Sequence, residues 1–176
     1  MNRLKITIAG IAVLSFALGI PAAYGATSTA SHAVTVNVPS VISLTADTAG
    51  IVLNFTDFVT GSESDIKTVN YTVKANNMSK TNGVVSAKLA SLFTDLSLRG
   101  DPGAYVKTGG NAHLEESAVG YITIDAVGVN LMNRVTDSGT GKVTRGTFPV
   151  SYKAVASADL SPDVQIQNLT ITLTDV

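Results

Sequence analysis

Apolar and polar residues alternate along most of the chain, which is the pattern of β-strands with one buried face. The alternation is interrupted at short intervals by residues typical of turns, such as Asn, Asp, Gly and Pro. It predicts strands over residues 34–38, 42–44, 51–55, 69–75, 84–92, 119–126, 127–135, 142–156 and 164–173. Seven to nine short strands with few helices predict an all-β fold, in the form of a single antiparallel immunoglobulin-like β-sandwich.

Two sequence features make specific predictions about strand pairing. Asn82-Gly83 lies between the strands expected at 69–75 and 84–92. Because both residues tolerate positive φ, this pair predicts a tight hairpin that joins the two strands. Pro149 interrupts the long strand expected at 142–156, and since proline cannot donate to a strand ladder it predicts an edge strand or a bulge.

The last expected strand contains a change of phase. Val164 and Ile166 occupy even positions, whereas the apolar residues that follow occupy odd positions, namely Leu169, Ile171 and Leu173. A strand turns successive side chains to opposite faces, so half of these residues face water unless an extra residue is inserted. The pattern therefore predicts a β-bulge near Gln167-Asn168.

The first 25 residues have the pattern of a secretory signal peptide. Arg3 and Lys5 precede an apolar run over residues 6–20, and the small-residue pattern Ala23-Tyr24-Gly25 follows. The run is shorter than the ~20 residues that a membrane-spanning helix needs. We therefore expect cleavage after Gly25 and an exported protein, secreted or held at the cell surface, that meets the membrane only through the cleaved segment.

Composition argues against several kinds of chemistry. The 176 residues include 12 basic and 13 acidic side chains and no cysteine, which disfavours a nucleic-acid partner and excludes thiol catalysis and Cys-ligated metals. His32 and His113 lack the spacing of a metal site. Clustered carboxylates such as Glu115-Glu116 do not match a calcium-binding loop. We expect no catalytic residue, no metal and no cofactor, and so no enzyme.

The mature chain is expected to begin with a flexible extension, residues 26–33, followed by a β-sandwich domain over residues 34–176. Val34, Val36 and Val38 alternate with polar residues at this junction. An uncovered strand of valines invites pairing with another strand. The valines are either the ordinary first strand of their own domain, or a strand donated to the open sheet of a neighbour.

Several segments of the chain resemble the cysteine-free major pilins of the colonisation-factor class of chaperone–usher fimbriae. The similar segments are 34–44 (VTVNVPSVISL), 52–55 (VLNF), 71–77 (YTVKANN), 84–90 (VVSAKLA) and 169–173 (LTITL). The resemblance implies an incomplete sandwich that lacks its final strand and receives the N-terminal extension of the next subunit. It also implies that Val34, Val36 and Val38 are the donated residues, and that the partners are further copies of the chain, a periplasmic chaperone and an usher.

Two functions from different classes follow from the sequence. One is a structural subunit of a surface fibre or pilus that polymerises by donating its N-terminal strand. The other is a monomeric secreted or surface binding domain for carbohydrate or protein, using the glycine-rich loops at 100–111 and 137–141. The first of these is expected to contain one short extended piece around Tyr105 and Val106.

Overall fold

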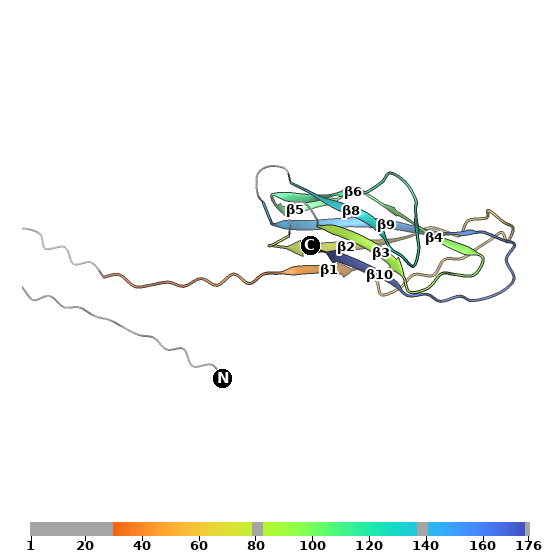
Figure 1. The fold of residues 1–176 in the computed structure, drawn as a ribbon, viewed down its shortest axis with the longest axis horizontal. Helices are drawn as coiled ribbons and strands as arrows, with labels where there is room; N and C mark the ends of the chain where they lie inside the picture. Colours follow the sequence, from red (N-terminus) through yellow and green to blue (C-terminus); the bar gives the residue numbers. More distant parts are fainter. Residues whose placement is uncertain (1–29, 79–82, 137–140, 175–176) are drawn as a thin grey trace, which may run out of the picture. The chain divides into compact units, whose positions relative to one another are not determined.

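The structure, a computed structural model, describes residues 30–78, 83–136 and 141–174, and these residues contain ten β-strands and no helix (Figure 1). The strands are β1 (Ile42–Ala46), β2 (Lys67–Ala75), β3 (Val84–Leu89), β4 (Leu96–Pro102), β5 (Val106–Gly110), β6 (Ala112–Glu116), β7 (Ile122–Ile124), β8 (Val129–Thr136), β9 (Thr144–Ala156) and β10 (Leu169–Thr174). The chain from Val38 onward forms one compact unit, and the described residues before it belong to a separate unit. The predicted signal peptide lies outside the described residues.

The ten strands form one sheet that nearly closes on itself. Seven of them follow in the order β1-β2-β9-β6-β8-β3-β10, while β4 and β5 also pair with β9 and β7 pairs with β4. All pairings are antiparallel except a short parallel contact between Ala112 of β6 and Thr144 of β9. The predicted all-β, antiparallel, sandwich-like fold is confirmed, and the near closure of its sheet gives it a barrel-like character.

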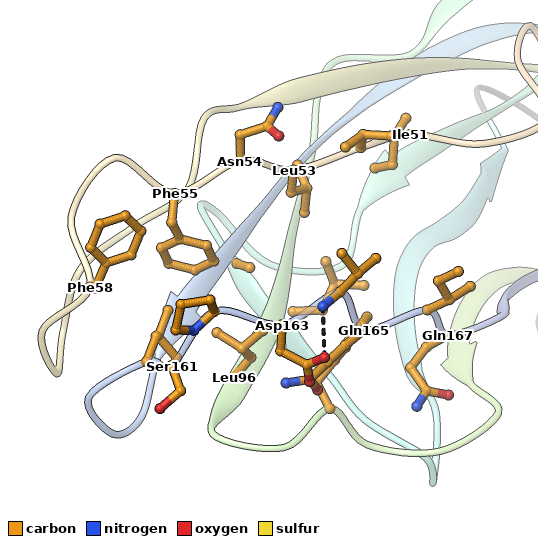
Figure 2. A pocket seen from close by; sticks show the side chains of 18 of the residues that line it. Ile51, Leu53, Asn54, Phe55, Phe58, Leu96, Ser161, Asp163, Gln165 and Gln167 are labelled. Carbon is orange, nitrogen blue, oxygen red and sulfur yellow. Dashed lines mark hydrogen bonds between the residues drawn. The ribbon is translucent and has the colours of Figure 1, made fainter.

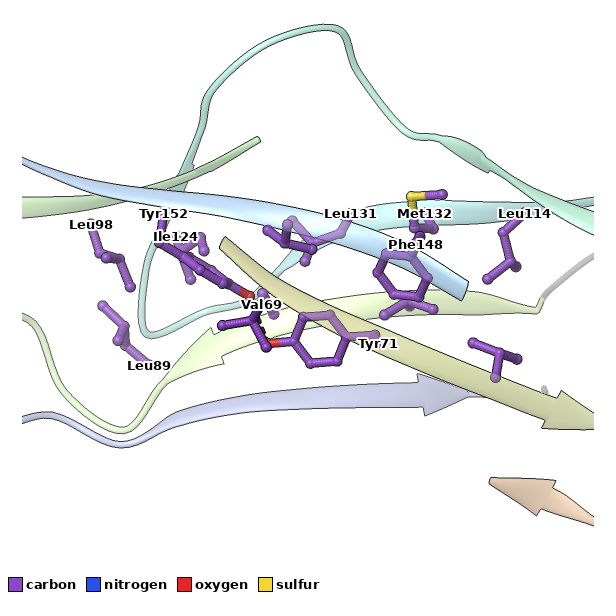
Figure 3. Close-up of a cluster of buried hydrophobic side chains, with 14 of the residues drawn as sticks. Val69, Tyr71, Leu89, Leu98, Leu114, Ile124, Leu131, Met132, Phe148 and Tyr152 are labelled. Carbon is purple, nitrogen blue, oxygen red and sulfur yellow. Dashed lines mark hydrogen bonds between the residues drawn. The ribbon is translucent and has the colours of Figure 1, made fainter. Parts of the chain in front are cut away.

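The core lies between β2 and β9 on one side and β3, β6 and β8 on the other (Figure 3). The even-numbered residues of β9 from 144 to 156 are all buried, as the alternation predicts. Tyr71 of β2 stacks on Phe148 of β9, with ring centroids 5.4 Å apart. The hydroxyl groups of Tyr71 and Tyr152 are hydrogen-bonded to each other at 2.9 Å, and burial raises the pKa of both phenols. These two buried hydroxyl groups thus satisfy each other.

The predicted hairpin between 69–75 and 84–92 is wrong. β2 pairs with β1 along one edge and with β9 along the other, whereas β3 pairs with β8 and β10. After β2 the chain passes through Met78, which is fully buried and donates its backbone N–H to the carbonyl of Lys142 at 3.0 Å. Because both edges of β2 are occupied, β3 joins a distant part of the sheet. Asn82 lies outside the described residues.

The prediction that Pro149 marks an edge strand or a bulge is also wrong. β9 is a central strand, paired with β2 across Pro149 itself. On its other edge, β9 pairs with β5 as far as Thr147 and with β4 from Val150 onward, so Pro149 lies opposite the gap between them. Its carbonyl accepts a hydrogen bond from the N–H of Gly103 at 2.9 Å in this gap. The nitrogen of a strand residue points the same way as its carbonyl, so the missing N–H costs no ladder bond.

The predicted bulge at Gln167-Asn168 is not formed. β10 pairs with β3 in one continuous register, from Leu169 opposite Leu89 to Thr174 opposite Val84. The residues that precede it, 161–168, contain no strand. Since the strand begins after the change of phase, no extra residue has to be accommodated within it. The apolar side chains before the change of phase are left exposed instead, 84% for Val164 and 83% for Ile166.

Candidate functional site

The sheet has two ends that face each other without being paired. β1 and β10 are the terminal strands of the sheet order, and they lie close together without a hydrogen-bonded ladder between them. Each therefore presents one unpaired edge, which is the usual template for an added strand. We call the line between these two edges the seam.

The seam widens at one end into an apolar groove of about 700 Å³ (Figure 2). One wall is the segment 51–55 together with Phe58, the other is the segment 160–169, and the floor is formed by side chains of β3, β4 and β9. The floor residues are Leu89, Leu96, Leu98 and Ala154, and Phe93 adds to the lining. A groove with extended walls and an apolar floor fits an extended peptide with apolar side chains at alternate positions.

The wall formed by residues 51–55 keeps the alternation of a strand without belonging to one. Its odd-numbered residues Ile51, Leu53 and Phe55 are half-buried, while the even-numbered residues are exposed. Asp65 anchors this wall: its carboxylate accepts the backbone N–H of Asn54 at 2.7 Å, and its own N–H donates to the Asn54 carbonyl at 2.8 Å. The Asn54 N–H, and next the ammonium group of Lys67 at 2.9 Å, lower the pKa of Asp65.

The opposite wall is held by two glutamine side chains. The Gln165 amide makes two hydrogen bonds with the backbone of Thr94, accepting from its N–H at 2.8 Å and donating to its carbonyl at 3.0 Å. Gln167 accepts from the Ser91 hydroxyl at 2.7 Å. In Figure 2 both glutamine side chains point away from Ile51 and Leu53 across the groove. Side-chain amides here replace the strand ladder that would otherwise fix this segment to its neighbour.

Along the seam the apolar side chains are covered only in part. Leu44 of β1 and the three predicted residues of β10, Leu169, Ile171 and Leu173, pack against the core but are half-buried rather than buried. Strands of comparable composition in the centre of the sheet are fully covered on this face. The predicted C-terminal core strand is therefore an edge strand whose inner face is partly open.

The valine ladder is exposed. Val34, Val36 and Val38 are 73%, 78% and 74% exposed, and no strand is assigned over residues 30–41. The first strand of the domain is instead β1, which starts at Ile42. The ladder thus does not take the place of an ordinary first strand in this structure.

The tether between the ladder and the domain is also too short for Val36 to reach the far part of the groove wall in its own chain. Val41 lies opposite Asn76 beyond one end of β2, and Asn54 lies opposite Asp65 beyond the other end. The nine residues of β2 separate them by about 26 Å. The five residues from Val36 to Val41 span at most about 18 Å. Val36 therefore falls short of the groove wall at Asn54.

The other candidates from the sequence form no site within the described part of the chain. His113 lies on β6 with its Nε2 3.0 Å from the Glu115 carboxylate, and His32 is exposed. In the described ranges no three or more His, Asp or Glu side chains are grouped so that they could hold a metal ion. The glycine-rich segment 100–111, expected to be a loop with one short extended piece around Tyr105 and Val106, is mostly strand, because β4 continues to Pro102 and β5 fills 106–110. Of 137–141, only Gly141 is described.

Comparisons with protein-family models, curated proteins and solved structures find no match for this chain. A search of the described residues also finds no helix that is long and apolar enough to span a membrane.

Proposed function

We propose that this chain is an exported structural subunit of a surface fibre, which polymerises by donating the strand around Val34, Val36 and Val38 to the groove of the next copy. One observation carries the proposal: the chain has an open apolar groove between two unpaired sheet edges, together with an exposed apolar ladder whose Val36 cannot reach the groove wall at Asn54. An open apolar groove and an exposed apolar ladder at different places on one chain favour a head-to-tail contact between molecules.

Periodicity supports this pairing of ladder and groove. The valines recur at every second residue, so an extended donor turns all three to the same face. The groove offers apolar side chains on both walls and on its floor. A donated strand that enters the groove also pairs its backbone with the unpaired edge of β1 or of β10, which removes the hazard of that exposed edge.

The proposal includes export through a signal peptide cleaved after Gly25, and a location on the cell surface. The resemblance to the colonisation-factor pilins adds a periplasmic chaperone and an usher as partners. A subunit with an open groove benefits from a chaperone before assembly, because exposed apolar surface and open edges promote aggregation.

The test is the assembly state of the chain from Ala26 to Val176, measured by size exclusion with light scattering and by negative-stain electron microscopy. We expect thin filaments that are lost in Val36→Asp, because transfer of a carboxylate into an apolar groove costs several kcal/mol. Val127→Asp is the matched control, since Val127 is 86% exposed and does not line the groove. Only monomer at every concentration would overturn the proposal and favour a monomeric binding domain.

A further inference from the structure

The valine ladder is joined by a short segment to β1, whose free edge could pair with it in place of another copy. The ladder ends at Val38, only four residues before β1 begins at Ile42. The free edge of β1 is therefore the nearest unpaired edge to the valines. A short tether gives an effective concentration of about millimolar, so the valines should fold back on their own β1 and compete with donation to another copy.

Asn76 holds the tether in a position that opposes folding back. It follows directly after β2, and its side-chain oxygen accepts the backbone N–H of Val41 at 2.7 Å. Its side-chain nitrogen donates to the carbonyl of Pro39 at 2.7 Å, and its backbone N–H donates to the Val41 carbonyl at 3.0 Å. One residue thus fixes two backbone positions of the segment that joins the ladder to β1.

Proline makes the same segment stiff. The ring of Pro39 fixes its own φ, and it restricts Val38 to an extended conformation. A tight reversal at 39–41 would have to break the hydrogen bonds that Pro39 and Val41 make with the Asn76 side chain. The bound residues 39–41 instead continue the line of β1 past the end of β2.

On the basis of the proposed function, we propose that Asn76 is a positioning residue. It suppresses pairing of the valine ladder with its own β1, so that the ladder stays available to a second copy of the chain. Loss of the two side-chain hydrogen bonds should raise the ratio of folded-back to extended tether about tenfold. The domain itself should remain folded, because β1 keeps its ladder to β2 from Ile42 to Ala46.

The experiment uses introduced cysteines, because the chain has none of its own. In the chain from Ala26 to Val176, the pair Val36→Cys and Ile166→Cys reports a ladder seated in a groove. The pair Val36→Cys and Thr45→Cys reports a ladder folded back along β1, where Thr45 is exposed. After treatment with a short bismaleimide, a denaturing gel separates links within one chain from links between chains.

Each pair is combined with Asn76→Ala, Asn76→Asp and the control Asn70→Ala. Asn70 lies on β2 and, like Asn76, donates its side-chain amide to a residue that flanks β1. This residue is Asp47, at 2.7 Å, at the other end of β1. Asn76→Asp keeps the acceptor for Val41 and loses the donor to Pro39, so an intermediate effect is expected. Circular dichroism and a cooperative unfolding transition check that each variant is folded.

With Asn76 intact, we expect the groove pair to give multimers and the β1 pair to give little product. Asn76→Ala should raise the within-chain product of the β1 pair about tenfold and reduce multimers, while Asn70→Ala should leave both unchanged. Unchanged products in Asn76→Ala, or abundant within-chain product with Asn76 intact, would overturn the role of Asn76. Absence of multimers from the groove pair in every background would instead contradict the proposed function itself.

Discussion

The two sides of this domain differ in how completely their strands are covered. Around β2 and β9, side chains such as Val73, Phe148 and Val150 are fully buried. Along the seam, Leu44 and Leu169 are equally apolar but only half-buried. The cause is the number of neighbours: β9 has strands on both edges, whereas β1 and β10 have one each. Alternation alone therefore predicts which face points inward, while pairing decides whether that face is covered.

Replacing a phenylalanine by alanine, once in the closed core and once in the open groove wall, should give the largest difference in stability. Phe148→Ala should lower the free energy of unfolding by about 3–5 kcal/mol, because it empties a fully enclosed site and removes the stacking on Tyr71. Phe55→Ala, in the groove wall, should cost about 1 kcal/mol, because that side chain is already half-exposed. Urea unfolding of both variants measures the difference.

Phe55→Ala should instead weaken binding of a peptide with the sequence of residues 30–40, measured by isothermal titration calorimetry. Equal stability losses in Phe148→Ala and Phe55→Ala would show that the groove wall is part of the core. In that case the distinction between a closed side and an open side would fail.

The sequence predicted the strands better than their partners. The strand at 69–75 follows from local alternation, and β2 covers it. The hairpin predicted from Asn82-Gly83 is wrong because pairing depends on which strand edges are free. Both edges of β2 are already paired, one with β1 and the other with β9. Two strands distant in sequence thus outweigh a favourable local turn.

In the sequence, the only sign of the groove is that the apolar residues change from even to odd positions just before β10. Val164 and Ile166 disagree in parity with the residues of β10, and a bulge was expected to resolve the disagreement. In the structure the residues stay exposed and line the groove. An apolar phase change next to an edge strand can therefore indicate a missing partner, but the sequence does not distinguish this from a bulge.

Removing the hydrogen bonds that Gln165 makes in the groove wall should have a moderate effect on stability and on peptide affinity. Gln165→Leu keeps the size of the side chain and removes both hydrogen bonds to the backbone of Thr94. The free energy of unfolding should fall by about 1–2 kcal/mol. Affinity for the 30–40 peptide should fall about tenfold, because the wall is no longer held in place. Asn168→Leu is the matched control, since Asn168 is exposed and does not line the groove. A stability loss without an affinity change would limit Gln165 to a structural role.

The smallest predicted effect is a loss of peptide affinity at acidic pH. Asp65 holds the 51–55 wall, and Asp159 accepts the backbone N–H of Thr60 at 2.9 Å near the same end of the groove. Hydrogen bonds from Asn54 and Thr60 respectively lower the pKa of these carboxyls below the ordinary 3.8. A lowered pKa means that the contribution of each carboxylate is present above pH 3.8 and is lost as the pH falls through the folded value. Asp159 is exposed and Asp65 is partly exposed, so the contribution is small.

We therefore expect affinity for a peptide of residues 33–40, which omits His32, to be constant from about pH 7 to pH 5. It should weaken only below pH 3.8, where Asp65 and Asp159 begin to take up protons. The double variant Asp65→Asn and Asp159→Asn should show a flatter profile in that acid range, because neither amide titrates. A profile that already falls near pH 6 would show that a group other than these two carboxylates controls binding. In that event Asp65 and Asp159 would not be the groups that keep the groove wall in place for peptide binding.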